Sequence, residues 1–512
     1  MTLFAERTMD RQGALARAFA ASPFARVAIA FAIVLAWCAL VRLPYLNFNT
    51  PDGGFFTEVA LLWRQGQLPY VGAFDIKPPG FFAVLALSQS MFGPGAAALH
   101  AVGTVSDAAT IALMLHLARR HGAPGVGVYA ALLFPWFSQV VIGDDSYSFL
   151  IAVTTAAMAI GLSDLPMPRR AALAGLAIGA ACVVKQTAVF EGAALLAILL
   201  SDTRAAGRRA GVVALFIVAA SLAPLACVAY FAAHGALDAM LSDVVGVALL
   251  RPGSSSDGVS LWRGLSRFVY RAKDLLPVLI AAALTSLLQF RAPRPRAPIP
   301  ALSAWFAAAL AGVFVQHALY STYLGPLLAP ALLLSGFGGA VVLRARPALA
   351  RGARYCAVAV ATFVATTSLA LTALRWQIEA NTIEDVAAAI RAEHPGGQDR
   401  LYVIQSASTF VWLYPLTGLR PATPFLIPLQ SMCDFPNVGP RRILEAFAAH
   451  PRFVVAGVAE NRYNCEVDAA SASIEAALRR DYRRIASVAC DGRHCAKGED
   501  YGVYEIVSPS AQ

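Results

Sequence analysis

The sequence predicts an α-helical polytopic membrane protein with a small α/β domain at its C-terminal end. Of the 512 residues, 58% are hydrophobic and only 14% are charged, and the mean hydropathy is +0.60. This composition is typical of a membrane protein. From about residue 376, the apolar runs become short and alternate with amphipathic stretches. The chain therefore divides into a cytoplasmic segment (1–23), a transmembrane domain (24–375) and a soluble domain (376–512).

The apolar runs predict about eleven transmembrane helices, because about 20 residues cross a hydrocarbon core of about 30 Å. Arginine clusters follow several of these runs, and the positive-inside rule places such clusters in the cytoplasm. The N-terminus is then cytoplasmic and the C-terminal domain periplasmic, in a bacterial inner membrane. The predicted spans lie near residues 24–43, 97–118, 124–142, 147–163, 171–184, 187–200, 210–233, 275–290, 299–317, 322–342 and 355–374.

Residues 80–95 are apolar, but we expect them to stay on the outer side. The stretch is short and ends at Gly93-Pro94-Gly95. A crossing here would move every later arginine cluster outward, against the positive-inside rule. The segment is therefore predicted to be an interfacial or re-entrant helix.

The net charge of +10 does not indicate nucleic acid as a partner. On a soluble protein, such a charge would raise that question. Here the arginines cluster between apolar runs, where they set the topology of the chain. The expected partners are membrane lipids.

The loop after the first span carries most of the polar residues in this part of the chain. Asp52 follows the span directly, and Lys77 stands before two prolines in the same loop. Between them, Phe55, Val59 and Leu62 recur at helical spacing, which predicts a helix that lies in the membrane interface with its apolar face down. An acidic and a basic residue in this position predict a polar site at the membrane surface.

Two further outer turns carry charged residues. Asp145 stands in Gly143-Asp144-Asp145 before the fourth span, where it is either a helix cap or a ligand for a metal or an acceptor hydroxyl. Lys185 stands between the fifth and sixth spans, where snorkelling toward the headgroups would explain it. Lys77 and Lys185 are nevertheless two of only four lysines in the chain, and both are expected on the outer face.

A basic helix is predicted in the long outer loop at 234–274. Arg263, Arg267 and Arg271 recur every four residues and form one cationic edge of an amphipathic segment. Such an edge on the outer leaflet is expected to bind an anion. Anionic headgroups in general and one specific lipid phosphate both remain open as its ligand.

Two carboxyl groups are expected within the membrane, where ionisable groups are costly unless they are paired or hydrated. Asp107 lies seven residues after His100 on one helical face, so the two form either a structural pair or part of a cavity wall. Glu191 has the same status.

The soluble domain is predicted to be a small α/β unit in which strands and helices alternate. It has no glycine-rich phosphate loop and no Ser-His-Asp spacing, so we expect a cap or an acceptor-docking surface. Its predicted strands lie at 400–405, 452–457 and 501–507, and its predicted helices at 383–394, 440–450 and 470–482.

The four cysteines of this domain are expected in an oxidising compartment, where two disulfides are the natural interpretation. The simplest pairing joins Cys490 with Cys495 and Cys433 with Cys465, although four cysteines allow three pairings. A zinc site is the competing interpretation, but no CxxC pair supports it.

In these positions the chain resembles the lipid-linked-sugar glycosyltransferases of the GT-C fold, in the family 39-like branch of protein O-mannosyltransferases and lipid A aminoarabinose transferases. The resemblance covers most of residues 24–345. It rests on the order of Asp52, Tyr70 in LPYVGAFD, Lys77-Pro78-Pro79, Asp145, Lys185 and Tyr323 in STYLGPLLAP.

The resemblance implies that a sugar moves from a polyprenyl-phosphate carrier to an acceptor hydroxyl at the outer face, with inversion at the anomeric carbon. It implies that Asp52 is the general base and that Lys77 and Tyr323 contact the carrier phosphate. A positioned base and cations near a departing phosphate are what such a transfer needs. The donor is then a polyprenyl-phosphate sugar, and the acceptor is a glycan, a lipid or a protein.

The chain also differs from that family. Gly53 stands where the family commonly has glutamate, Phe55 where the aminoarabinose branch has arginine, and Thr322 where a histidine is often found. No cofactor is firmly implied, and a divalent metal remains open. The alternative function is a non-catalytic protein that binds or transports lipid-linked sugars, although the sequence shows no internal repeat of the kind that transporters often have.

Overall fold

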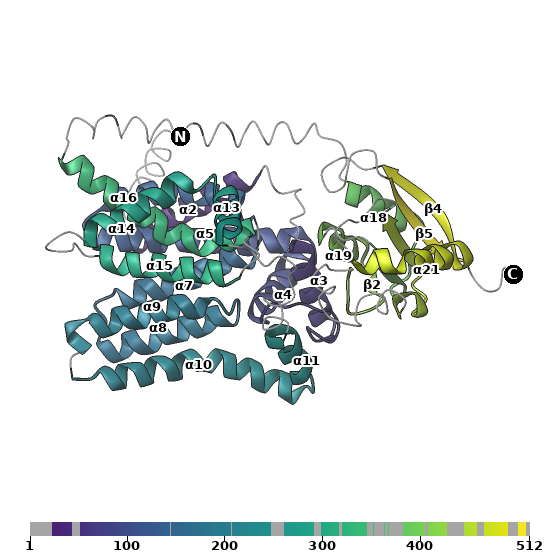
Figure 1. Ribbon diagram of the computed structural model, residues 1–512, viewed down its shortest axis with the longest axis horizontal. Helices are drawn as coiled ribbons and strands as arrows, with labels where there is room; N and C mark the ends of the chain where they lie inside the picture. Colours follow the sequence, from purple (N-terminus) through teal and green to yellow (C-terminus); the bar gives the residue numbers. More distant parts are fainter. Residues whose placement is uncertain are drawn as a thin grey trace, which may run out of the picture.

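The computed structural model describes residues 23–43, 52–143, 145–205, 207–246, 261–290, 298–316, 320–345, 382–404, 408–427, 445–457, 465–489 and 500–507, with single positions at 352, 363 and 367. Figure 1 shows a large body of packed helices and, beside it, a smaller C-terminal unit that contains the strands.

Ten of the predicted spans coincide with helices of the structure. α6 continues into the π-helix η2 (Ser138–Ile142), and the 3-10 helix η5 (Ser321–Leu327) leads into α16. The span predicted at 355–374 lies almost entirely outside the described residues. The helices are α2 (Pro23–Arg42), α5 (Ala96–Arg120), α6 (Pro124–Phe137), α7 (Ser146–Gly161), α8 (Met167–Cys182), α9 (Ala188–Ser201), α10 (Arg209–Ala233), α14 (Leu276–Phe290), α15 (Ile299–Val315) and α16 (Leu328–Ala345).

The helices have the length and surface of a membrane domain. In the part of the chain that the structure describes, four stretches could each cross a membrane by length and apolar composition alone: Ala96–Arg120, Pro124–Ile142, Arg209–Ala233 and Ser321–Arg344. Other apolar helices are shorter, so the number of about eleven spans stays a prediction. α10 packs chiefly against α8 and exposes large apolar side chains, to which lipid is the natural solvent: Ile217, Val218, Leu222 and Leu225. The fold class is a helical polytopic membrane protein, as predicted.

Two short helices follow the first span. α3 (Gly53–Arg64) begins after Asp52, and α4 (Gly80–Phe92) ends before Gly93, whose φ of 84° is a conformation that favours glycine. At a rise of about 1.5 Å per residue, α4 is about 20 Å long, which is shorter than a hydrocarbon core of about 30 Å. Because α9, a predicted span, has only 14 residues, this length does not decide the matter, and the place of residues 80–95 outside the membrane stays a prediction.

The environment of α3 differs from the expected membrane interface. All residues from Gly53 to Ala60 are buried, including Glu58, which is 2% exposed. The reason is that η6 (Ser408–Trp412) and α19 (Leu413–Thr417) of the C-terminal domain pack against this helix. In Figure 1, α3 and α4 accordingly lie between the other helices and α19.

The long outer loop contains a helix that turns sharply into the next span. α13 (Leu261–Arg271) is followed by α14, and the segments Gly264–Arg271 and Leu276–Gln289 are bent by 113°. This geometry fits the predicted basic helix at the membrane surface. Three shorter elements precede it in the described part of the chain, namely η3 (Thr203–Ala205), α11 (Leu237–Leu241) and η4 (Ser242–Gly246).

The C-terminal domain contains a five-stranded sheet with the order β2-β1-β3-β5-β4. β1 runs parallel to β2 and β3, whereas β5 is antiparallel to β3 and β4. The sequence predicted β1, β3 and β5 but missed the two-residue β2 and also β4, which follows directly on a helix. The strands are β1 (Arg400–Ile404), β2 (Arg420–Pro421), β3 (Phe453–Gly457), β4 (Tyr482–Ala489) and β5 (Asp500–Ile506), and the further helices are α18 (Thr382–Ala392) and α21 (Cys465–Asp481).

One hydrophobic core joins the membrane helices to this domain. Phe56 of α3 and Trp412 of η6 belong to it, as does Val403 of β1. A second cluster, which includes Phe447 and Tyr482, lies within the domain alone. The predicted disulfides involve side chains outside the described residues, so the pairing stays a prediction.

Candidate active site

Charged and aromatic residues from five segments meet on one side of the helical body. They come from the start of α3, the loop before α4, the start of α7, the turn between α8 and α9, and η5. The residues are Asp52, Lys77, Asp145, Lys185 and Tyr323, all of which the sequence singled out.

Lys77 has several partners in this cluster. Its Nζ lies 3.5 Å from Asp52 Oδ2, 3.8 Å from Asp75 Oδ1 and 4.6 Å from the centre of the Phe56 ring. Burial alone would lower the pKa of the Lys77 ammonium, but the carboxylates of Asp75, Asp52 and Asp145 outweigh it and raise that pKa. The side chain is 17% exposed and stays cationic.

Asp52 precedes α3 without capping it through its side chain. Its backbone carbonyl accepts a hydrogen bond from the Phe56 amide at 3.2 Å, but its carboxylate makes no capping bond. The side chain is 44% exposed and points its Oδ2 toward Lys77. The carboxylate therefore keeps acceptor positions that a ligand can use.

Asp145 caps α7, which is one of the two roles that the sequence left open for it. Its Oδ1 accepts hydrogen bonds from Ser146 Oγ at 2.6 Å and from the Tyr147 amide at 3.4 Å. Burial and the charge of Asp52 raise the pKa of the Asp145 carboxyl, while Lys77 and Lys185 oppose this increase. Asp145 is thus a buried cap that also lies in the field of both lysines.

Lys185 lies between two tyrosine rings. Its Nζ is 3.9 Å from the centre of the Tyr147 ring and 4.5 Å from that of Tyr323. The Tyr147 hydroxyl donates to Gln316 Oε1 at 2.9 Å, which fixes this ring. Cation–π contacts of this kind stabilise a partly desolvated ammonium. Sequence reasoning missed Tyr147, and its position two residues after Asp145 was the available signal.

A close backbone contact brings the two lysines together. The Gly80 amide donates to the Val183 carbonyl at 2.7 Å, which joins the loop after Lys77 to the turn before Lys185. A Cβ on Gly80 would lie 2.6 Å from that carbonyl oxygen, so only glycine fits here.

Tyr70 holds the same loop from the other side. Its hydroxyl donates to the Lys77 carbonyl at 2.8 Å, and its ring packs against Phe231 with centroids 5.4 Å apart. Its φ of 70° is rare for a residue with a side chain, and such strain is kept where the surrounding structure demands it. Tyr70 therefore fixes the backbone at Lys77.

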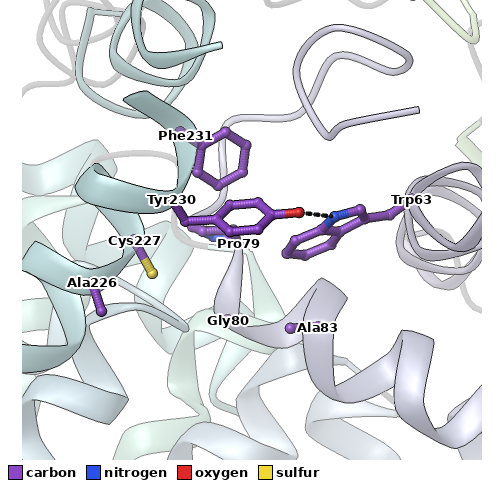
Figure 2. Close-up of a pocket in the computed structure, with 8 residues that line it drawn as sticks. All are labelled: Trp63, Pro79, Gly80, Ala83, Ala226, Cys227, Tyr230 and Phe231. Carbon is purple, nitrogen blue, oxygen red and sulfur yellow. Dashed lines mark hydrogen bonds between the residues drawn. The ribbon is translucent and has the colours of Figure 1, made fainter. Parts of the chain in front are cut away.

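An apolar pocket of about 230 Å³ opens beside this loop, between α3, α4 and α10. Trp63 Nε1 donates to the Tyr230 hydroxyl at 3.1 Å across the pocket (Figure 2). Pro79 and Gly80 form another part of its wall, so the pocket begins two residues from Lys77. The remaining lining residues are Ala83, Ala226, Cys227 and Phe231.

The predicted basic helix, α13, carries an exposed arginine and packs against α15 through an aromatic contact. Arg271 is exposed and lies 5.8 Å from the Tyr270 ring centre, whereas the side chain of Arg263 lies outside the described residues. Phe268 stacks on Phe314 with centroids 5.2 Å apart, which places α13 against the end of α15. Gln316, the partner of Tyr147, lies two residues farther along that segment.

The intramembrane carboxyls have structural partners. Asp107 accepts from Arg42 Nη2 at 2.9 Å and from Ser138 Oγ at 3.1 Å, so it forms an ion pair with Arg42. Glu191 accepts from Trp305 Nε1 at 2.6 Å. Both carboxyls thus stabilise helix packing.

A divalent metal finds no ready ligand set in the part of the chain that the structure describes. No three His, Cys, Asp or Glu side chains lie together there in a way that could hold an ion.

Comparisons with known proteins define the class of the fold. No family profile and no curated protein matches the sequence. The structure of ArnT from Cupriavidus metallidurans bound to undecaprenyl phosphate is similar, with a TM-score of 0.62 and 16% identity over 95% of this chain and 99% of ArnT. ArnT in the apo state gives a TM-score of 0.56 and 16% identity over 94% of this chain and 98% of that one. The chain has the GT-C fold that the sequence predicted.

Proposed function

We propose that this protein is an inverting glycosyltransferase that moves a sugar from a polyprenyl-phosphate carrier to an acceptor hydroxyl. The observation that carries the proposal is the uncapped Asp52 carboxylate, 3.5 Å from the partly buried Lys77 ammonium. A base and a phosphate-binding cation are the two groups that the transfer requires, and here they are adjacent.

In this mechanism Asp52 accepts the proton of the acceptor hydroxyl. The acceptor oxygen then forms a bond to the anomeric carbon while the bond from that carbon to the phosphate oxygen breaks, which inverts the configuration. Lys77 and Lys185 offset the charge that grows on the leaving phosphate, and the Tyr323 hydroxyl donates to it. Asp145 holds the start of α7 and orients Lys185 through its charge.

The apolar pocket beside Pro79 supports a carrier with a hydrocarbon tail. A phosphate held by Lys77 would leave its first isoprene units near Trp63 and Tyr230. The similar protein ArnT was solved with undecaprenyl phosphate, a carrier of this kind. The identity of the sugar is left open by these features, and the acceptor is a glycan, a lipid or a protein.

We also propose that the site faces the periplasm of a bacterial inner membrane, with the N-terminus cytoplasmic and the C-terminal domain periplasmic. Arginine clusters in the alternate loops support this orientation. Reporter fusions after His121 and after Arg400 should report cytoplasm and periplasm, respectively. The opposite pair of results would reverse the orientation and move the site to the other face.

The competing function is a protein that binds or transports lipid-linked sugar without transferring it. Gly53, Phe55 and Thr322, which differ from the residues common in the resembled family, are the observation that favours it. The role of Asp52 distinguishes transfer from transport, because a transporter has no need of a base next to the phosphate-binding lysine.

Mass comparison of surface glycans, with and without the protein, tests the proposal. Loss of a sugar from a lipid, glycan or protein in the deletion strain, restored by the wild type but not by Asp52→Asn, is the expected result. Restoration by both would support transport. The masses would also identify the sugar and the class of acceptor.

A further inference from the structure

The C-terminal domain contacts both segments that carry the proposed catalytic pair. One contact is made with α3, which begins directly after Asp52. The other is made with the loop that leads to Lys77. The sequence assigned this domain a cap or an acceptor-docking surface, neither of which requires contact with these two segments.

The contact with α3 is a close approach of two backbones. Gly54 lies two residues after Asp52, and a Cβ on it would lie 2.8 Å from the Trp412 nitrogen and 3.1 Å from the Val411 carbonyl carbon. These are main-chain atoms of a segment whose Trp412 is 1% exposed. A side chain at position 54 would therefore push α3 and the domain apart.

The contact with the Lys77 loop is both polar and aromatic. The Phe74 amide donates to the Pro424 carbonyl at 2.8 Å, and the Phe74 and Phe425 rings lie 5.4 Å apart. Phe74 precedes Asp75, which accepts from the Lys77 amide at 2.9 Å. A displacement of the Phe74 backbone is thus expected to move Lys77 through Asp75.

The two contacts belong to a single connected piece of the domain. The buried Tyr414 hydroxyl donates to the Leu426 carbonyl at 2.6 Å, which ties the segment at Trp412 to the segment at Pro424. Because one connected segment contacts both α3 and the loop before Lys77, it sets the separation of these two elements.

We propose that residues 411–426 are a positioning segment that fixes the Asp52 carboxylate relative to the Lys77 ammonium. The effect of this segment on catalysis rests on the proposed function. Its effect on the separation of Asp52 and Lys77 does not. Phe425 of this segment and Gly54 of α3 are positioning residues, because they act through the contacts between the segment and the two site elements.

The test pairs each variant with a matched control. Phe425→Ala removes the contact with Phe74, and Phe447→Ala removes a similar ring from the second core cluster of the same domain. Gly54→Ala inserts a methyl group between the backbones, and Gly211→Ala inserts one on α10, where nothing lies within 4 Å.

Two measurements are made on each purified full-length protein. The first is chemical modification of Lys77 relative to the exposed Lys273, read by mass spectrometry, which needs no activity. The second is sugar transfer, with kcat and KM separated. Thermal unfolding shows which variants are folded.

In Phe425→Ala and Gly54→Ala, modification of Lys77 should rise relative to Lys273 and kcat should fall by about 10²-fold, the effect of a misplacement of about 1 Å. KM should change less, and both controls should resemble the wild type. Folded test variants with wild-type Lys77 modification would overturn the inference. If Gly54→Ala does not fold, Phe425→Ala decides. Raised Lys77 modification in a protein whose wild type transfers no sugar would uphold the positioning role and reject the proposed function.

Discussion

The starts of α3 and α7 present the same residue type in two different states. Each helix begins after an aspartate of the candidate site, Asp52 or Asp145. Asp145 is 5% exposed and accepts hydrogen bonds from its own helix, whereas Asp52 caps nothing and is 44% exposed in its side chain. Asp52 is instead held by Lys77, 3.5 Å away.

This difference separates a structural carboxylate from one that is ready for chemistry. A capping carboxylate accepts hydrogen bonds from backbone N–H groups and stabilises its helix. An uncapped carboxylate next to a cation keeps lone pairs with which it can accept a proton from a ligand. An aspartate before a helix is therefore one sequence signal with two outcomes, and the neighbours decide between them.

The largest effect is expected for Asp52→Asn. A positioned base contributes about 10²- to 10⁴-fold, so transfer should fall by that factor while the melting temperature stays close to the wild-type value, since no cap is lost. Single-turnover transfer by the reconstituted protein, together with donor binding, measures this. Wild-type transfer by Asp52→Asn would remove the distinction between the two aspartates.

Lys77→Ala should weaken both donor binding and turnover. Loss of a charge-assisted hydrogen bond to phosphate corresponds to about 1.5 to 3 kcal/mol. Titration with a polyprenyl phosphate that carries no sugar would isolate the phosphate contribution. Lys273→Ala is the matched control, because its side chain is exposed outside the cluster; equal losses in the two variants would argue against a specific phosphate site.

A third carboxyl group, that of the buried Glu58 in α3, predicts that the stability of the protein depends on pH. Burial raises the pKa of Glu58 to about 8 from its ordinary value of 4.5. The folded protein then keeps a proton that the unfolded chain releases, so this group makes stability fall as pH rises from about 4.5 to about 8. Glu58→Gln should reduce that fall and stabilise the protein at pH 8 by about 1 to 3 kcal/mol. Melting temperatures at pH 5 and pH 8 measure it, and parallel pH curves would contradict it.

Asp145→Ala should cost about 1 kcal/mol in stability, the typical value of a lost helix cap. Asp145→Asn keeps an acceptor at the cap and should cost less. Asp52→Ala, by contrast, removes no capping bond and should leave stability nearly unchanged. Denaturant unfolding of the three variants tests the comparison directly. A larger loss of stability at Asp52 than at Asp145 would invert it.

The smallest effect is expected on α13. Arg271→Gln removes one exposed cation, which near an anionic membrane surface contributes about 1 kcal/mol. Binding to vesicles with and without anionic lipid should show the loss only with the anionic lipid, and Arg344→Gln at the end of α16 serves as the control. A loss of donor affinity without an effect on vesicles would assign Arg271 to the donor site instead.

Much of the site could be predicted because membrane topology confines function to one side. Apolar runs and arginine clusters identify the outer loops, and few polar residues remain in them. Asp52, Lys77, Asp145 and Lys185 were found for this reason, and Tyr323 through the family resemblance. Tyr147 was missed because its available signal, a position two residues after Asp145, does not distinguish a site residue from an ordinary aromatic residue at the start of an apolar helix.

The sequence by itself determined the membrane class, the positions of most helices and several residues of the charged cluster. These properties are sums over local windows, and hydropathy adds along the chain. Tertiary structure alone decided that Gly80 meets Val183, that Asp107 pairs with Arg42, and that the C-terminal domain buries α3. Such contacts join residues far apart in the chain and depend on how helices pack, so no local pattern encodes which aspartate caps its helix and which faces a lysine.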